Sequence, residues 1–67
     1  MDKQLVKQKI ADFEYYQNGY NQLNGADVKI INLHVGKIIA TADVILSDGD
    51  IKTRVNACEY PLVELGL

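Results

Sequence analysis

The chain has 67 residues, of which 48% are hydrophobic and 24% are charged, and its formal net charge is −2 at pH 7. This length allows one small domain, so we expect residues 1–67 to fold as a single unit. The hydrophobic content excludes an intrinsically disordered chain, and the lone cysteine, Cys58, excludes a framework of internal disulfides. The small net charge gives no general attraction to nucleic acid or to anionic lipid.

Targeting and size lead to two further expectations. No apolar run approaches the roughly 18 residues of a membrane-spanning helix, and residues 1–4 lack the apolar core of a secretory signal. We therefore expect a cytoplasmic protein that does not contact a membrane. A domain this short buries only about 60% of its unfolded surface. Because the sequence offers no disulfide, metal site or cofactor motif to add stability, we expect a homo-oligomer, most simply a dimer.

The first third of the chain carries a helical pattern from Asp2 to about Asn24. Its apolar residues recur at spacings of three, four or seven, namely Val6, Ile10, Phe13, Tyr20 and Leu23. Asp2 is suited to cap the first turn. Asn18-Gly19 interrupts the pattern, because glycine costs about 1 kcal/mol inside a helix, and the helix could instead end near Gln17. We favour the longer helix because the apolar period continues beyond the glycine.

From Asp27 onward the hydrophobic period changes to two, which is typical of strands. Three segments rich in β-branched residues follow one another, from Asp27 to Leu33, from Lys37 to Leu46 and from Asp50 to Ala57. A short apolar turn comes after Pro61. The sequence therefore predicts an α+β fold with the order α-β-β-β, in which the N-terminal helix packs on a three-stranded antiparallel β-meander and a short C-terminal turn closes one end.

Asp48-Gly49 predicts the second hairpin. A two-residue hairpin loop needs positive φ at both of its positions, and Asp-Gly is a pair that favours such a loop. This loop would place Leu46 opposite Ile51 on an apolar inner face. It would also place Asp43 opposite Arg54 on a polar outer face. A slip of one residue would destroy that division.

The first hairpin is predicted to turn at Val35-Gly36. With that loop, Ile31 and Leu33 would face the helix, whereas Ile30 and Ile39 would point outward. Ile45 also falls on the outer face in the second hairpin. These three outward isoleucines on a small domain suggest a contact patch rather than scattered exposed side chains.

Other apolar side chains also exceed what the predicted core can hold. Tyrosine is enriched at protein interfaces because it joins a large apolar body to a hydrogen-bonding tip, although packing at the edge of the helix would explain the tyrosines equally well. The apolar C-terminal tail adds two leucines. The predicted interface residues are Tyr15, Tyr16, Tyr20, Ile30, Ile39, Ile45, Leu65 and Leu67.

These surfaces favour a non-enzymatic protein-interaction module, a small accessory, regulatory or inhibitor-type protein of a microbe or phage that acts as a homo-oligomer. The alternative is a small nucleic-acid-binding domain that uses Lys37, Lys52 and Arg54 on the outer face. Residues 26–67 carry four positive and six negative side chains, so we expect no nucleic-acid partner.

In element order only, the predicted fold resembles the first part of a double-stranded-RNA-binding domain. That family ends in a second helix that begins with a basic cluster. The matching region here, Glu59-Tyr60-Pro61-Leu62-Val63-Glu64, is acidic and apolar. We therefore do not transfer the family's function to this chain.

His34 and Cys58 are the two residues that could support catalysis, as a thiol activated by an imidazole. Such a dyad needs an orienting group and a cleft, and a zinc site would need three or four ligands. The two aspartates beside Gly49 fit a turn rather than a calcium loop. We expect no enzyme, no bound metal and no cofactor.

Overall fold

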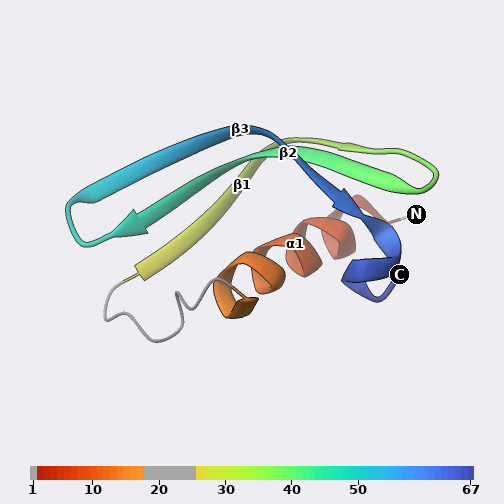
Figure 1. Cartoon of the computed structure of the whole chain (residues 1–67), viewed down its shortest axis with the longest axis horizontal. Helices are drawn as coiled ribbons and strands as arrows, with labels where there is room; N and C mark the ends of the chain where they lie inside the picture. Colours follow the sequence, from red (N-terminus) through yellow and green to blue (C-terminus); the bar gives the residue numbers. More distant parts are fainter. Residues whose placement is uncertain (1, 18–25) are drawn as a thin grey trace.

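The computed structural model describes residues 2–17 and 26–67. Helix α1 (Lys3–Gln17) is followed by strands β1 (Ala26–Val35), β2 (Ile39–Asp48) and β3 (Ile51–Pro61) and by the 3-10 helix η2 (Leu62–Leu65). The strands form one antiparallel sheet in the order β1-β2-β3, and both helices lie beneath the same face of it (Figure 1). This arrangement confirms the predicted α+β fold, its α-β-β-β order and its short C-terminal turn.

Helix α1 begins where the sequence predicts. The Asp2 carboxylate accepts a hydrogen bond from the Gln4 amide at 2.9 Å, which satisfies a backbone donor that the first turn leaves free. Val6 and Ile10 are fully buried, one turn apart on the same face. The predicted continuation of the helix to Asn24 lies outside the described residues.

The hairpin between β2 and β3 closes one residue later than predicted. Asp48 pairs with Ile51, so Gly49 and Asp50 form the loop, and Gly49 has the positive φ of 63° that such a loop requires. Leu46 therefore lies opposite Thr53 instead of Ile51. Residues of β2 near the turn thus pair two positions further along β3 than predicted. Because side chains alternate between faces with a period of two, this shift leaves each side chain on its predicted face.

The first hairpin differs more from its prediction. Val35 pairs with Ala40, and the Gly36 amide donates to the Ile39 carbonyl at 2.9 Å, so the loop covers residues 36–38. The prediction that Ile30 lies on the outer face is wrong, since its side chain is 2% exposed and belongs to the core. Ile38, at the end of this loop, is 80% exposed.

Two β-bulges explain why simple alternation fails. In β1 the register shifts between Ile31 and His34, and in β3 it shifts opposite Asp43. Asn32 and Ala57 adopt left-handed φ values of 53° and 55° at these points. Each bulge adds one residue to an outer strand, so the inward face moves from one set of alternate residues to the other.

The core lies between α1, η2 and the lower face of the sheet. The buried residues are Val6, Ile10, Ile30, Leu33, Ala40, Ala42, Val44, Tyr60, Leu62 and Leu65. The predicted contact surface of the C-terminal tail therefore needs correction, because Leu65 is buried and Leu67 packs against the core.

Tyr60 joins the end of β3 to α1. Its ring packs edge to face against Phe13, with centroids 6.0 Å apart, and its hydroxyl donates to the Glu14 carboxylate at 2.6 Å. Burial, together with this bond to a carboxylate, raises the pKa of Tyr60. Within the described residues, no helix has both the length and the apolar character needed to cross a membrane.

Candidate interaction groove between helix α1 and the edge of β1

Three hollows lie in a row between α1 and β1, and we call them together the α1–β1 groove. They measure about 470, 270 and 260 Å³. The helix contributes Lys3, Gln4, Lys7, Gln8, Ala11, Asp12 and Tyr15 to their walls, and the strand contributes Asp27 to His34. The groove thus follows nearly the whole length of both elements.

One wall of the groove is an open sheet edge. β1 pairs with β2 on one side, and in the described residues no strand pairs with it on the other. Alternate backbone N–H and C=O groups of such an edge point away from the sheet and can pair with another strand. From Ala26 to Ile31 the pairing with β2 is regular, so this stretch presents an uninterrupted template.

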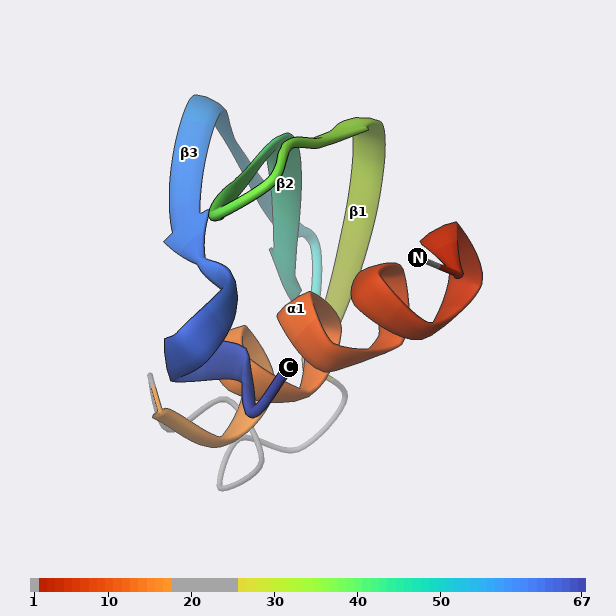
Figure 2. The ribbon, with the colours of Figure 1, turned by 90° about the vertical axis from the view of Figure 1, so that its right-hand side faces the viewer.

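The other wall is a flank of α1 at the margin of the core, where Ala11 packs against the buried cluster. Gln4, Gln8, Ala11 and Tyr15 recur at spacings of four, three and four, which places them on one side of the helix. The first turns of α1 extend past β1 in the view of Figure 2, so this flank stands beside the strand edge. Side chains of this helix flank would therefore lie beneath any strand added to β1.

Charge is distributed unevenly along the groove. Lys3 and Lys7 line its largest hollow, whereas Asp12 and Asp27 line the hollow at the opposite end. Lys29 lies in the middle and is exposed, as is Asp27. Between described residues the one ion pair joins Asp43 and Arg54, so none of these groove charges is neutralised by another.

Asp43 organises a polar cluster on the opposite, outer face of the sheet. Its Oδ2 accepts hydrogen bonds from Asn32 at 2.9 Å and from Arg54 at 3.0 Å, and its Oδ1 accepts one from the Ala57 amide at 2.9 Å. The bonds from Asn32 and Ala57, aided by Arg54, lower the pKa of Asp43, although partial burial opposes them. Asp43 thus fastens both bulges to the central strand.

A hollow of about 330 Å³ lies next to this cluster, between Asn32, His34, Thr41 and Ala57. Both carboxylate oxygens of Asp43 are already engaged by the chain's own donors. The cluster therefore has a clear structural purpose, and it offers a ligand little beyond the His34 ring. The predicted pairing of Asp43 with Arg54 is confirmed, although Arg54 lies directly opposite Ile45.

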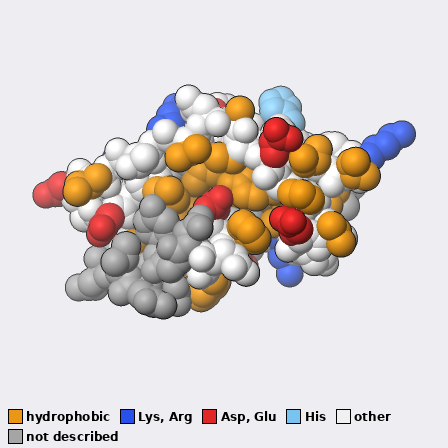
Figure 3. Space-filling model, viewed as in Figure 1, with side chains coloured by type: hydrophobic (Ala, Val, Ile, Leu, Met, Phe, Trp, Pro, Cys, Tyr) orange, Lys and Arg blue, Asp and Glu red, His pale blue; other side chains and the backbone are white. Residues whose placement is uncertain are grey.

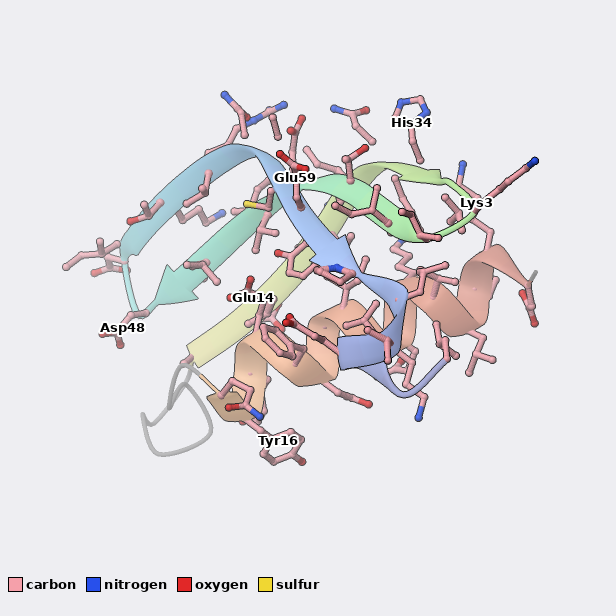
Figure 4. The ribbon with its side chains drawn as sticks, turned by 45° about the vertical axis from the view of Figure 1, so that its right-hand side comes forward. Lys3, Glu14, Tyr16, His34, Asp48 and Glu59 are labelled. Atoms are coloured by element: carbon pink, nitrogen blue, oxygen red, sulfur yellow. The ribbon has the colours of Figure 1, made fainter. Side chains whose placement is uncertain are left out.

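The two contact tyrosines that the structure describes differ in their exposure. Tyr15 is half-buried at the acidic end of the groove, and its ring packs edge to face against Tyr16 with centroids 5.2 Å apart. Tyr16 is 63% exposed and points away from the sheet (Figure 4). Tyr20 lies outside the described residues. Of the two described tyrosines, Tyr15 lines the groove and Tyr16 does not.

The predicted isoleucine patch is not formed as a unit. Ile30 is buried below the sheet, whereas Ile39 and Ile45 are half-buried. Ile45 sits between Lys29 on β1 and Arg54 on β3, so charged side chains flank it on both sides. The outer face is consequently more polar than the sequence pattern indicates.

A second apolar surface appears where the loop before β2 meets η2. The Leu62 amide donates to the Ile38 carbonyl at 2.9 Å, and the side chains of Ile38 and Val63 are 80% and 78% exposed. Figure 3 shows hydrophobic side chains grouped over this end of the molecule. Nothing in the structure indicates what would cover them.

The predicted nucleic-acid residues do not converge. Lys37 belongs to the loop before β2, whereas Lys52 follows the hairpin at the other end of that ten-residue strand, roughly 33 Å away. Arg54 is engaged by Asp43 and by the Asn56 side chain at 2.8 Å. The three cations therefore form no continuous basic surface.

His34 and Cys58 lie on opposite faces of the sheet. His34 is exposed opposite Thr41 and projects upward in Figure 4, whereas Cys58 lies opposite Ala42 and packs against the core. A thiol–imidazole dyad is therefore not assembled. Among the described residues, no three His, Cys, Asp or Glu side chains are grouped to hold a metal ion.

Sequence reasoning missed most of the residues that make the groove, although the predicted interface residues Tyr15 and Ile30 do line it. One signal was present, since Gln4, Gln8, Ala11 and Tyr15 form a second helical stripe beside the core positions. Comparisons of the chain with protein-family models, with curated proteins and with solved structures find no match. The geometry of the groove therefore carries the functional argument.

Proposed function

We propose that this protein is a non-enzymatic interaction module that binds a polypeptide as an added strand along the open edge of β1. The observation that carries this proposal is the α1–β1 groove, which runs beside an unpaired and regular strand edge. In strand addition, backbone hydrogen bonds supply affinity and side chains supply specificity. The helix flank provides the side chains in this case.

The lining residues suit such a ligand. Gln4 and Gln8 are exposed amides that can both donate and accept hydrogen bonds, and the charged ends of the groove can fix the direction of an entering strand. A small accessory, regulatory or inhibitor-type protein that acts as a homo-oligomer would use such a surface. The nucleic-acid alternative receives less support, because its three cations are dispersed and one of them is paired.

The proposal is tested with a displayed library of random peptides selected against the folded chain. Bound peptides are then located by amide chemical-shift changes in the labelled protein. We expect the shifts to follow β1 and the Gln4–Tyr15 flank, and we expect Gln8→Trp to obstruct binding. Lys9→Trp is the matched control, because Lys9 is exposed and lines none of the three hollows. Absence of binders, or binders located at Ile45 and Arg54, would contradict the proposal.

The same labelled protein tests the nucleic-acid alternative with a pool of random single-stranded DNA. Phosphate contacts make affinity fall steeply with salt. We expect no salt-dependent shifts at Lys37, Lys52 or Arg54. Such shifts would favour the alternative over strand addition.

A further inference from the structure

We infer that the strand added to the α1–β1 groove is β1 of a second copy of this chain, paired antiparallel about a two-fold axis at Val28. This inference rests on the proposed function and names its partner. It would join two three-stranded sheets into one of six strands, with the two α1 helices side by side beneath it. A two-fold interface uses the same patch on both chains, so the groove must be complementary to itself.

The charge gradient of the groove meets that requirement. One end carries Lys3 and Lys7, and the other carries Asp12, all three on helix α1. An antiparallel two-fold arrangement places the basic end of each copy against the acidic end of the other. A parallel arrangement would instead place like charges together, which disfavours association.

The outward charges of β1 select the register. Residues opposite each other in an antiparallel pair project to the same face, so only registers centred on a residue keep the buried face buried. A centre at Asp27 or at Lys29 would place that residue against its own copy, with like charges opposed. A centre at Val28 places Asp27 opposite Lys29 of the second copy, and the symmetry repeats the pair.

The same register places apolar residues on the inner side. Val28 meets its own copy, and Ala26 lies opposite Ile30 of the second chain. Val28 is half-buried and packs against the existing core, so the two cores would become continuous across the axis. Exposed charges thus lie above the joined sheet, and apolar side chains lie below it.

The position of α1 is also consistent with a two-fold axis at Val28. The middle hollow is lined by Gln8 and Ala11 together with Val28, which places the centre of the helix stripe next to the centre of the strand register. Antiparallel helices about that axis bring Gln8 near Ala11 of the second copy and Gln4 near its Tyr15. The half-buried Tyr15 would then gain a partner at the end of the groove.

A charge exchange tests this arrangement by sedimentation equilibrium at low salt. Asp27→Lys creates two Lys–Lys pairs across the axis, and Lys29→Asp creates two Asp–Asp pairs. We expect each variant to self-associate roughly tenfold more weakly than the native chain. An equimolar mixture of the two variants restores both attractive pairs, so we expect a heterodimer as stable as the native dimer. Asp48→Lys and Lys9→Asp are matched controls with exposed side chains outside the groove.

The outcomes separate this inference from the proposed function. Recovery of the dimer in the mixture supports the register. A native chain that stays monomeric at millimolar concentration overturns the inference, as do single variants that dimerise normally or a mixture that fails to recover although both variants fold. In each of those cases the proposed function stands if library peptides still bind the groove, and it falls separately if they do not.

Discussion

The two outer strands of the sheet each have an open edge among the described residues, but they differ in what lies beside that edge. β3 carries the Ala57 bulge, held by Asp43, and charged Lys52 and Arg54 project from the same stretch. β1 likewise carries the Asn32 bulge, held by Asp43, and the exposed charges of Asp27 and Lys29, so these common devices against unwanted strand pairing occur at both edges. β1 is regular from Ala26 to Ile31, and the flank of α1 lies beside it.

The difference indicates that an open edge is a binding site only where its surroundings favour a partner. Six successive residues of β3, Ile51 to Asn56, are exposed. A strand added there would gain few side-chain contacts from the described residues. A strand added to β1 would pack on the side chains of the α1 flank and would extend the core.

Ile10→Ala should have the largest effect. Ile10 is fully buried and holds α1 beneath the sheet. Truncation of a buried isoleucine costs about 2–5 kcal/mol, which is comparable to the whole stability of a domain this small. Urea unfolding followed by circular dichroism should show a chain that is largely unfolded. Leu5→Ala, at a half-exposed site on the same helix, is the control and should remain folded.

Tyr60→Phe should have a smaller effect, because the ring packing against Phe13 is retained. The variant loses the hydroxyl bond to Glu14, and a hydrogen bond to a charged group contributes about 1.5–3 kcal/mol. We expect the free energy of unfolding to fall by about 1–2 kcal/mol because water can partly replace the lost partner. Tyr16→Phe, at an exposed ring, should leave unfolding unchanged.

Asp43→Asn should loosen the bulges of both β1 and β3, because Asp43 accepts hydrogen bonds from Asn32 and from the Ala57 amide. The hydrogen bonds that Asp43 accepts lower its pKa in the folded state below the ordinary 3.8. A carboxyl of this kind stabilises the fold above its unfolded pKa, and the contribution is lost as the pH falls through its lower folded pKa. The native chain should therefore lose stability below about pH 4 more steeply than the variant. Parallel curves in urea titrations from pH 7 to pH 2 would show that Asp43 contributes nothing through its charge.

Ala57→Gly should have the smallest effect. Ala57 has a φ of 55°, a left-handed conformation that costs an L-residue roughly 1–2 kcal/mol and glycine very little. Glycine also gives the unfolded chain more freedom, which offsets part of the gain. We expect a stabilisation of about 0.5 kcal/mol, measured by thermal unfolding. A large destabilisation would mean that the bulge depends on the alanine methyl group.

Much of the fold could be predicted from the sequence because its signals are local. The Asp2 cap, the buried pair Val6 and Ile10, and the loop around Gly49 each depend on a few neighbouring residues. The salt bridge between Asp43 and Arg54 was also predicted, since opposite charges on adjacent strands tolerate a small change of register.

The bulges and the groove could not be predicted in the same way. Ile30 and Ile31 are adjacent, so alternation allows either of them to face the core, and an added residue at Asn32 determines the result. The groove depends on where α1 crosses the sheet, which is set by tertiary packing rather than by any local pattern. The prediction of an isoleucine patch was wrong because the bulge at Asn32 changes which residues face the core. The helix flank was missed because the position of α1 depends on tertiary packing.

Amide hydrogen exchange of the native chain, measured residue by residue at low and at high protein concentration, tests the central claim most directly. We expect amides of β1 between Ala26 and Ile31 to become more protected as concentration rises. Amides of β3 between Ile51 and Asn56 should keep the same exchange rates. Protection that grows at β3 instead, or that grows at neither edge, would contradict the claim that the edge of β1 is the site of association.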